Sequence, residues 1–197
     1  MEKEYYSVDE VKKIKITKHK EIMKEVLKTS LYLLFVLVLT FLTINFVGQR
    51  TEVIGSSMEP TLSEDDDLIA NKIAYRFSDP ERFDIIIFPY LYEEDTYYIK
   101  RIIGLPGETI YIDTDGNIYI NEELLYESYG NETIKDAGLA VNPIVLEDDE
   151  YFVLGDNRNN SKDSRFIDVG NVHRSQIIGK AGFRIFPFSK FGMLTHQ

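Results

Sequence analysis

Two adjacent serines in the stretch IGSSMEPTL, residues 54–62, are the first residues of this chain that could do catalytic chemistry. A serine hydroxyl becomes an effective nucleophile only when a nearby base accepts its proton. The alternative is an ordinary polar turn that Pro60 helps to close. The chemistry therefore depends on whether the chain supplies a base for Ser56 or Ser57.

Histidine is the usual base for a serine, and the chain has three histidines. His19 precedes a long apolar run that the serines follow, so a membrane would separate it from Ser57. His196 is the penultimate residue. His173 sits in a polar stretch, GNVHRSQ, without a local pattern that indicates catalysis. A Ser-His-Asp triad would therefore depend on His173 alone.

Lysine is the other candidate base, and Lys100 lies in the stretch TYYIKRIIGLPGE. In an extended strand Tyr98, Lys100 and Ile102 share one face, while Arg101 points to the other and is a candidate for structural pairing. Burial beside apolar neighbours would have to lower the lysine pKa by roughly three units. On the pattern alone, an edge-strand lysine that discourages aggregation is the simpler interpretation.

Composition excludes other kinds of chemistry. The chain has no cysteine, which excludes disulfides, thiolate nucleophiles and cysteine metal sites. Its net charge of −11 argues against nucleic acid as the main partner. The acidic run Glu64–Asp67 is interpreted as a solvated turn rather than a metal site. No sequence feature indicates a cofactor.

A long apolar run precedes the serines. Residues 31–47 carry no charge, and a helix over residues 30–48 would be close to the thickness of a bilayer core. The twenty residues before the run contain seven lysines, whereas the only basic residue among the twenty after it is Arg50. This asymmetry predicts a retained single-pass anchor with the N-terminus in the cytoplasm. The alternatives are a buried helix of a soluble domain and a cleaved targeting signal.

The sequence thus predicts three segments: a basic helical leader at residues 1–29, a transmembrane helix at 30–48 and an extracytoplasmic domain at 49–197. In the last segment, short apolar stretches such as DLIANKIAY and DIIIFPY recur between turn signals, and DTDGN is typical of a hairpin loop. The predicted fold class is mainly β, an antiparallel, coiled or barrel-like domain. Residues 122–150 contain nine acidic residues and one lysine and are interpreted as a surface excursion.

Four blocks, in order, resemble those of bacterial type I signal peptidases, the membrane-bound Ser–Lys endopeptidases. GSSMEPTL is similar to the nucleophile block, and YIKRIIGLPGE to the general-base block. GDNRNNSKDSR is similar to the late block of the family. RFDIIIF is similar to a strand block in which the family has glycine where this chain has Phe83. The resemblance covers about residues 30–187.

The resemblance implies roles for individual residues. Ser57 matches the nucleophile, Lys100 the general base, and Ser161 the serine that hydrogen-bonds and orients that lysine. The Ser57 backbone N–H is the implied oxyanion donor. Some relatives supply a second donor from a serine side chain at the position of Gly55, where a backbone N–H would have to substitute.

Three charged residues of the late block, Asp156, Asp163 and Arg165, match residues that support the site. A purely structural network is at least as good an interpretation for them as a direct catalytic role. Asp163 and Arg165 share a face if the segment is extended.

The resemblance implies a plasma-membrane serine endopeptidase that removes signal peptides from exported preproteins. Its partners would be signal peptides with small residues at the cleavage site, the lipid bilayer and, in addition, the export machinery. The alternatives are a Ser–Lys protease with a narrower client, such as a pilin or itself, and a catalytically dead binding or assembly factor. Candidate residues for the substrate pockets are Ile54, Met58, Ile86 and Phe88, although ordinary core is the better default interpretation of each.

Overall fold

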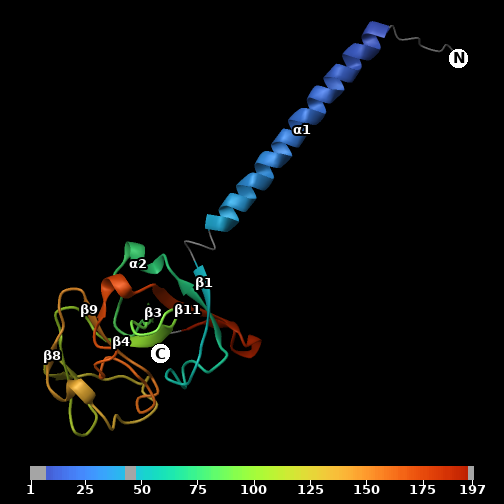
Figure 1. Ribbon diagram of the computed structural model, residues 1–197. Helices are drawn as coiled ribbons and strands as arrows, with labels where there is room; N and C mark the ends of the chain where they lie inside the picture. The colour runs from blue at the N-terminus through green and yellow to red at the C-terminus, as the bar shows by residue number, and fades with distance from the viewer. Residues whose placement is uncertain (1–7, 43–47, 195–197) are drawn as a thin grey trace. The chain divides into compact units, whose positions relative to one another are not determined.

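The computed structural model describes residues 8–42 and 48–194, which belong to two units, residues 1–45 and 46–197. In the first unit, α1 (Val8–Leu42) is one continuous helix of 35 residues, about 50 Å long (Figure 1). Residues 8–29 of the predicted leader and residues 30–42 of the predicted span are therefore parts of the same helix, and residues 1–7 of that leader lie outside the described residues. Residues 43–47 of that span lie outside the described residues.

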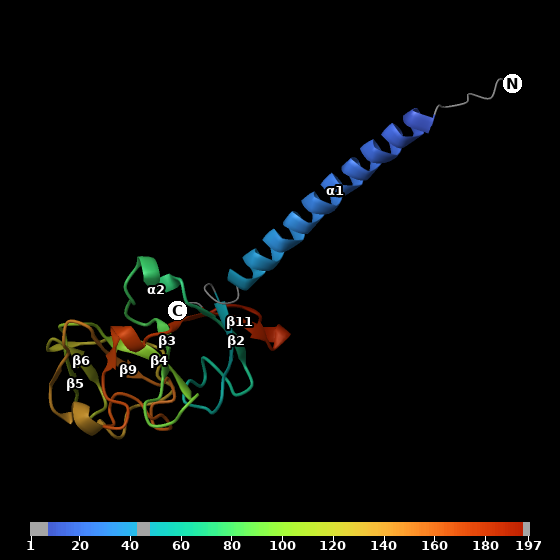
Figure 2. The ribbon, with the colours of Figure 1, turned by 45° about the horizontal axis from the view of Figure 1, so that its top comes forward.

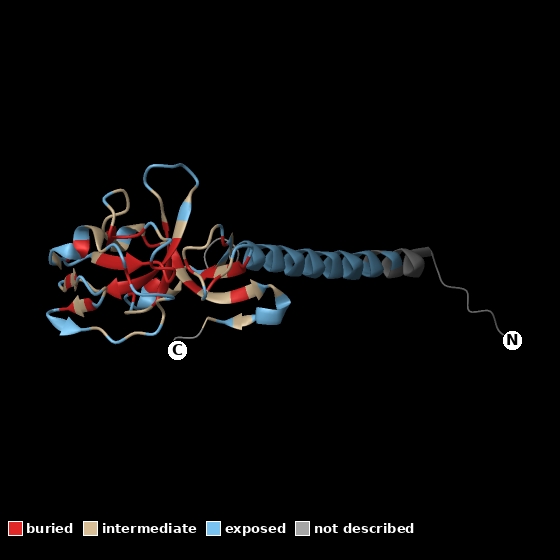
Figure 3. Cartoon of the chain, turned by 90° about the horizontal axis from the view of Figure 1, so that it is seen from below, coloured by how far each residue is buried: buried red, intermediate tan, exposed pale blue. Residues whose placement is uncertain are grey.

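The described side chains of α1 are exposed, whereas the buried residues gather on the strands of the second unit (Figure 3). Within residues 8–42 and 48–194, no helix combines the length and the apolar character needed to cross a membrane.

The second unit is mainly β, as predicted. Its strands are β1 (Gly48–Glu52), β2 (Asp67–Asn71), β3 (Ile85–Pro89), β4 (Tyr97–Gly104), β5 (Thr109–Ile112), β6 (Ile118–Ile120), β7 (Glu123–Leu124), β8 (Ile144–Val145), β9 (Glu150–Leu154), β10 (Val172–His173), β11 (Gly179–Phe186) and β12 (Gly192–Met193). The helical turns are α2 (Ala74–Phe77), η2 (Gly138–Val141), η3 (Arg174–Gln176) and η4 (Phe188–Lys190).

These strands form two antiparallel sheets rather than a closed barrel, so the barrel-like part of the prediction is wrong for the described residues. The larger sheet has the order β1-β2-β11-β3-β4-β9-β10, with β12 paired to β11. The smaller sheet has the order β7-β6-β5-β8. Figure 2 shows β5 and β6 at one end of this unit and β2 and β11 at the other.

The hairpin between β5 and β6 follows the sequence prediction. The Asp113 side chain accepts hydrogen bonds from the backbone N–H groups of Asp115 and Asn117, at 2.9 and 2.8 Å. Gly116 takes a φ of 80°, which glycine adopts without steric cost. The turn residues therefore set the register Ile110↔Ile120.

The central strands of the larger sheet carry apolar side chains on both faces. Ile85, Ile87 and Ile99 belong to one buried cluster, which includes Met58. Side chains of the alternate positions, such as Ile86 and Phe88, belong to a second cluster. The same alternation places Lys100, which pairs with Ile86, on the face of the second cluster.

Two acidic segments are less exposed than the sequence indicated. Residues 122–150 contribute buried side chains to the core of the smaller sheet, among them Ile134, Ala140 and Leu146. In the run Glu64–Asp67, predicted to be a solvated turn, two aspartates are buried: Asp66 pairs with Arg184 and Asp67 with Arg50. Pairing with arginine explains how these carboxylates tolerate burial. In the described part of the chain, no cluster of acidic or histidine side chains could hold a metal ion.

Candidate active site

A groove of about 650 Å³ contains the predicted nucleophile and the predicted base. Two segments of the chain line it: residues 49–54 with Ser57 and Met58, and residues 95–100 with Glu93. Lys162, whose side chain is largely exposed, lines it as well. On the β9 side of β4, the ladder begins only at Arg101, so the preceding residues present an open strand edge to the groove.

Lys100 and Ser57 are brought together across 43 residues of sequence. The Lys100 Nζ donates a hydrogen bond to the Ser57 Oγ at 2.7 Å and another to the Ile99 carbonyl at 3.0 Å. The lysine is only 3% exposed. Burial lowers the pKa of its amine to about 8, although the nearby carboxylates of Asp163 and Asp156 oppose that shift. Loss of one proton would turn the amine into an acceptor for the serine proton.

Two asparagines of the late block hold the serine loop, and the sequence reasoning did not identify them. The Asn157 backbone N–H donates to the Ser57 carbonyl at 3.1 Å, and its side chain donates to the Ser56 carbonyl at 3.0 Å. The Asn160 side chain donates to the Ser56 Oγ at 2.8 Å. The Ser56 hydroxyl is therefore engaged with Asn160, while the Ser57 hydroxyl meets the lysine.

Gly55, where a backbone N–H would have to act as the second oxyanion donor, has a φ of 81°, which favours glycine. A Cβ at this position would meet no atom within 4 Å, so the backbone conformation rather than space restricts the residue. A serine at this position would be strained. The absence of the side-chain donor that some relatives have there therefore agrees with the local backbone.

Ser161 is close to the serine loop but does not make the predicted bond to the lysine. Its hydroxyl is buried and has no hydrogen-bond partner among the described residues, while the Lys100 amine is directed to Ser57 and Ile99. Gly155 permits the close approach, because a Cβ there would overlap both the Ser161 Oγ and the Ser57 carbonyl oxygen.

Asp163 and Arg165 form a buried pair beside this loop. The Arg165 Nε donates to the Asp163 carboxylate at 2.8 Å, and both side chains are 1% exposed or less. The other Asp163 oxygen accepts from the Gly155 N–H at 3.1 Å. The hydrogen bonds of this pair are thus structural. The charge of the Asp163 carboxylate raises the pKa of Lys100 and so opposes the effect of burial.

Asp156 makes the second buried pair, with Arg101. The guanidinium donates from Nε and Nη2 to the two carboxylate oxygens at 2.8 and 2.6 Å. Thr61 donates to the same carboxylate at 2.5 Å. Arg101 is the residue after Lys100, and Thr61 lies in the segment IGSSMEPTL that carries Ser57. Through Asp156, the strand that carries the base is therefore connected to the segment that carries the nucleophile.

We expect Asp156→Asn to lower the free energy of unfolding by about 3–5 kcal/mol, because Arg101 would remain charged and buried without its partner. Urea unfolding of the full-length protein measures the change. Glu132→Gln is the control: it removes an exposed ion pair with Lys135 at 3.6 Å and should change stability by less than about 1 kcal/mol. A loss no larger for Asp156→Asn than for this control would contradict the structural role.

Phe83 replaces the glycine of the family block and still adopts a φ of 72°. A bulky residue rarely takes this conformation. Its surroundings hold it there: the Phe83 carbonyl accepts from the Arg101 Nη1 at 2.9 Å, and its ring lies 5.0 Å from the ring of Tyr129. The chain thus keeps the backbone turn that the glycine would give.

Of the remaining candidates, two line the groove and three do not. His173 is bonded to Asp149 and is not among the residues that line the groove. Of the predicted pocket residues, Ile54 and Met58 line the groove, whereas Ile86 and Phe88 are buried in the core.

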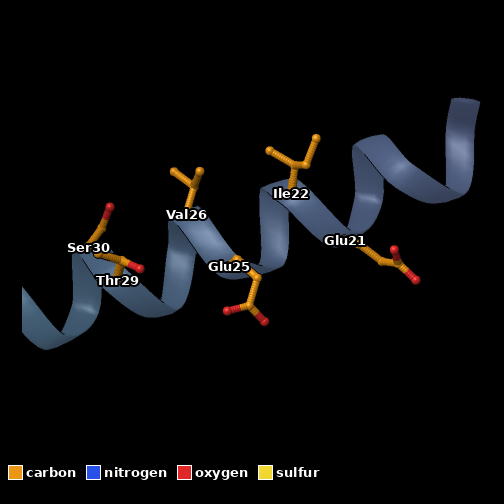
Figure 4. Close-up of a pocket in the computed structure, with 6 residues that line it drawn as sticks. All are labelled: Glu21, Ile22, Glu25, Val26, Thr29 and Ser30. Carbon is orange, nitrogen blue, oxygen red and sulfur yellow. The ribbon is translucent and has the colours of Figure 1, made fainter.

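A second, shallow depression lies on α1. Figure 4 shows its six side chains, Glu21, Ile22, Glu25, Val26, Thr29 and Ser30, projecting from successive turns. All of them belong to one helix, so the depression has no opposing wall within the described part of its unit. It offers no enclosed site.

Comparison with known proteins gives consistent matches. A family model described as "Signal peptidase, peptidase S26" matches residues 23–186. The chain is 41% identical over 155 residues to a "Probable signal peptidase I-2" of Synechocystis sp., covering 76% of this chain and 68% of the relative. It is 37% identical over 165 residues to "Signal peptidase I P" of Bacillus subtilis subsp. natto, and this match covers 80% of this chain and 88% of the relative.

A solved structure, that of a signal peptidase I from Enterococcus faecalis, matches with a TM-score of 0.42 and 35% sequence identity. It covers 52% of this chain and 97% of its own. The match to the family model, residues 23–186, includes all the groove residues described above.

Proposed function

Since the chain belongs to the signal peptidase family, peptidase S26, we propose that it removes signal peptides from exported preproteins with a Ser57–Lys100 dyad. The observation that carries this proposal is the 2.7 Å hydrogen bond between a buried lysine and a serine in an open groove. Within residues 8–42 and 48–194, no histidine lines that groove. The lysine is thus the available base.

The reaction begins when neutral Lys100 accepts the Ser57 proton. The serine oxygen attacks the carbonyl carbon at the end of the signal peptide, and an ester forms on Ser57 as the peptide bond breaks. The lysine returns its proton to the departing amine of the mature protein. Water then hydrolyses the ester, again with Lys100 as base. The Ser57 backbone N–H, which follows the left-handed turn at Gly55, is our proposed oxyanion donor.

The groove suits a substrate in extended conformation. A signal-peptide segment that lay along the open edge of Tyr97–Ile99 would add a strand to the sheet. Side chains one and three residues before the cut would share a face. Shallow pockets, to which Ile54 and Met58 contribute, would then favour small residues at those positions.

Membrane anchoring is the remaining part of the proposal. The uncharged run of residues 31–47 and the seven lysines before it support a single span with the N-terminus in the cytoplasm. The β unit would then work on the outer side, next to the lipid. Ser57 follows the end of that run by ten residues, so it would reach at most about 35 Å from the bilayer.

The test is cleavage of a preprotein by the full-length protein in detergent micelles, with the products measured by mass spectrometry. We expect two products whose masses place the cut after a small-x-small sequence. Uncut preprotein at long incubation times would overturn the proposal. A panel that includes a pilin precursor separates a general enzyme, which cuts most preproteins, from one with a narrow client range.

A further inference from the structure

A stack of tyrosine rings flanks the proposed base. Tyr98 lies on the same face of β4 as Lys100, and the lysine Nζ is 4.9 Å from the centre of its ring. Tyr90, which follows the end of β3, stacks on Tyr98 with the ring centres 4.6 Å apart and the planes at 10°. This stack closes one side of the space around the lysine amine.

Tyr90 is fixed from two directions. Its backbone N–H donates to the Thr96 carbonyl at 2.8 Å, which closes the loop between β3 and β4. Its hydroxyl lies 3.4 Å from the Asp168 carboxylate, and Asp168 in turn lies 3.5 Å from the Lys162 amine. The ring therefore connects the strand of the base to the segment that carries Ser161 and Asp163.

We propose that Tyr90 is a positioning residue for the dyad: it holds the Tyr98 ring against Lys100 and so keeps water away from the amine. This inference rests on the proposed function, because it assigns Lys100 the role of base. Among the contacts of the described residues, Tyr90 touches neither Ser57 nor Lys100, and it acts through Tyr98.

The direction of the effect follows from the groups around the amine. Burial favours the neutral amine, while the carboxylates of Asp156 and Asp163 and the face of the Tyr98 ring favour the charged form. The groove itself adds charged groups farther along its walls: Arg50, Glu52, Glu93, Asp95 and Lys162. Removing Tyr90 would leave these charges in place, but it would release the Tyr98 ring from its position against the lysine and admit water to the amine. Burial is the largest cause of the lowered pKa of Lys100, so its loss outweighs the loss of the ring contact. The balance would shift toward the protonated lysine.

The experiment measures kcat/KM for preprotein cleavage from pH 6 to 10 with full-length protein. For Tyr90→Ala we expect the midpoint of the rise to move up by about one pH unit, which lowers activity at pH 7 about tenfold and leaves it little changed at high pH. Tyr90→Phe keeps the stack and should retain the original midpoint. Tyr92→Ala is the matched control, since its exposed ring contacts Tyr90 from the same loop.

An equal loss at every pH, with the midpoint unchanged, would show a merely structural role and overturn the inference, and so would an unaltered profile. If Tyr90→Ala does not fold, Tyr90→Leu carries the same test with the same criterion. The two proposals fail separately. Cleavage that survives Ser57→Ala or Lys100→Met refutes the dyad, whereas an inactive pair of variants with an unshifted Tyr90→Ala midpoint refutes only the role of Tyr90.

Discussion

Ser57→Ala should reduce preprotein cleavage at least about a thousandfold, because removing a serine nucleophile leaves only the weak catalysis that binding and oxyanion donors provide. The β unit should remain folded, since the Ser57 contacts that hold the loop use its backbone carbonyl and not its hydroxyl. The measurement is the initial rate on one preprotein, with the urea unfolding curve of the variant recorded in parallel.

The chain supplies a matched control one residue away. The Ser56 hydroxyl accepts a hydrogen bond from Asn160, whereas the lysine donates to the hydroxyl of Ser57. Ser56→Ala should therefore keep activity within about threefold, the effect of one exposed hydrogen bond. If Ser56→Ala were inactive and Ser57→Ala active, the nucleophile would be the other serine.

Lys100→Met should have a comparable effect on the rate, since it removes the base that is hydrogen-bonded to Ser57 and keeps the length and bulk of the side chain. Stability should be unchanged or slightly higher, because an apolar side chain replaces a buried amine. Initial rates and urea unfolding, measured on the same preparation, separate the two effects.

Lys162→Met is the control for Lys100→Met, because Lys162 lines the same groove but is largely exposed and pairs with Asp168. We expect it to keep most of the activity. Near-normal turnover by Lys100→Met would exclude this lysine as the base. Equal losses in the two variants would show that the groove needs positive charge in general and not a base at one position.

Much of the fold follows from local patterns in the sequence. The alternation in TYYIKRIIG placed Lys100 and Tyr98 on one face of a strand, and the structure has them there. The hairpin at Asp113 could also be predicted from the sequence, because its turn depends only on residues close to it in the chain. Burial depends instead on distant partners: Asp66 and Asp67 were predicted to be solvated because nothing local indicates Arg184 or Arg50.

The site could be predicted in part. The family blocks identified Ser57, Lys100 and Ser161 as candidate residues, but they did not determine the hydrogen bonds among them. In the structure, the lysine donates to Ser57 and to the Ile99 carbonyl and not to Ser161. Asn157 and Asn160 were missed because their role is to bond a loop about a hundred residues earlier. The sequence signal that could have found them is the concentration of asparagine in GDNRNNS.

The claim on which the rest depends is that Lys100 is a neutral general base, and the pH dependence of kcat/KM tests it most directly. This quantity reports the ionisation of the free enzyme's essential base. With the pKa of Lys100 at about 8, activity should rise with pH as the amine loses its proton and level off above that value. A rise centred near pH 6.5, typical of a histidine, or a rate independent of pH between 6 and 10 would contradict the account.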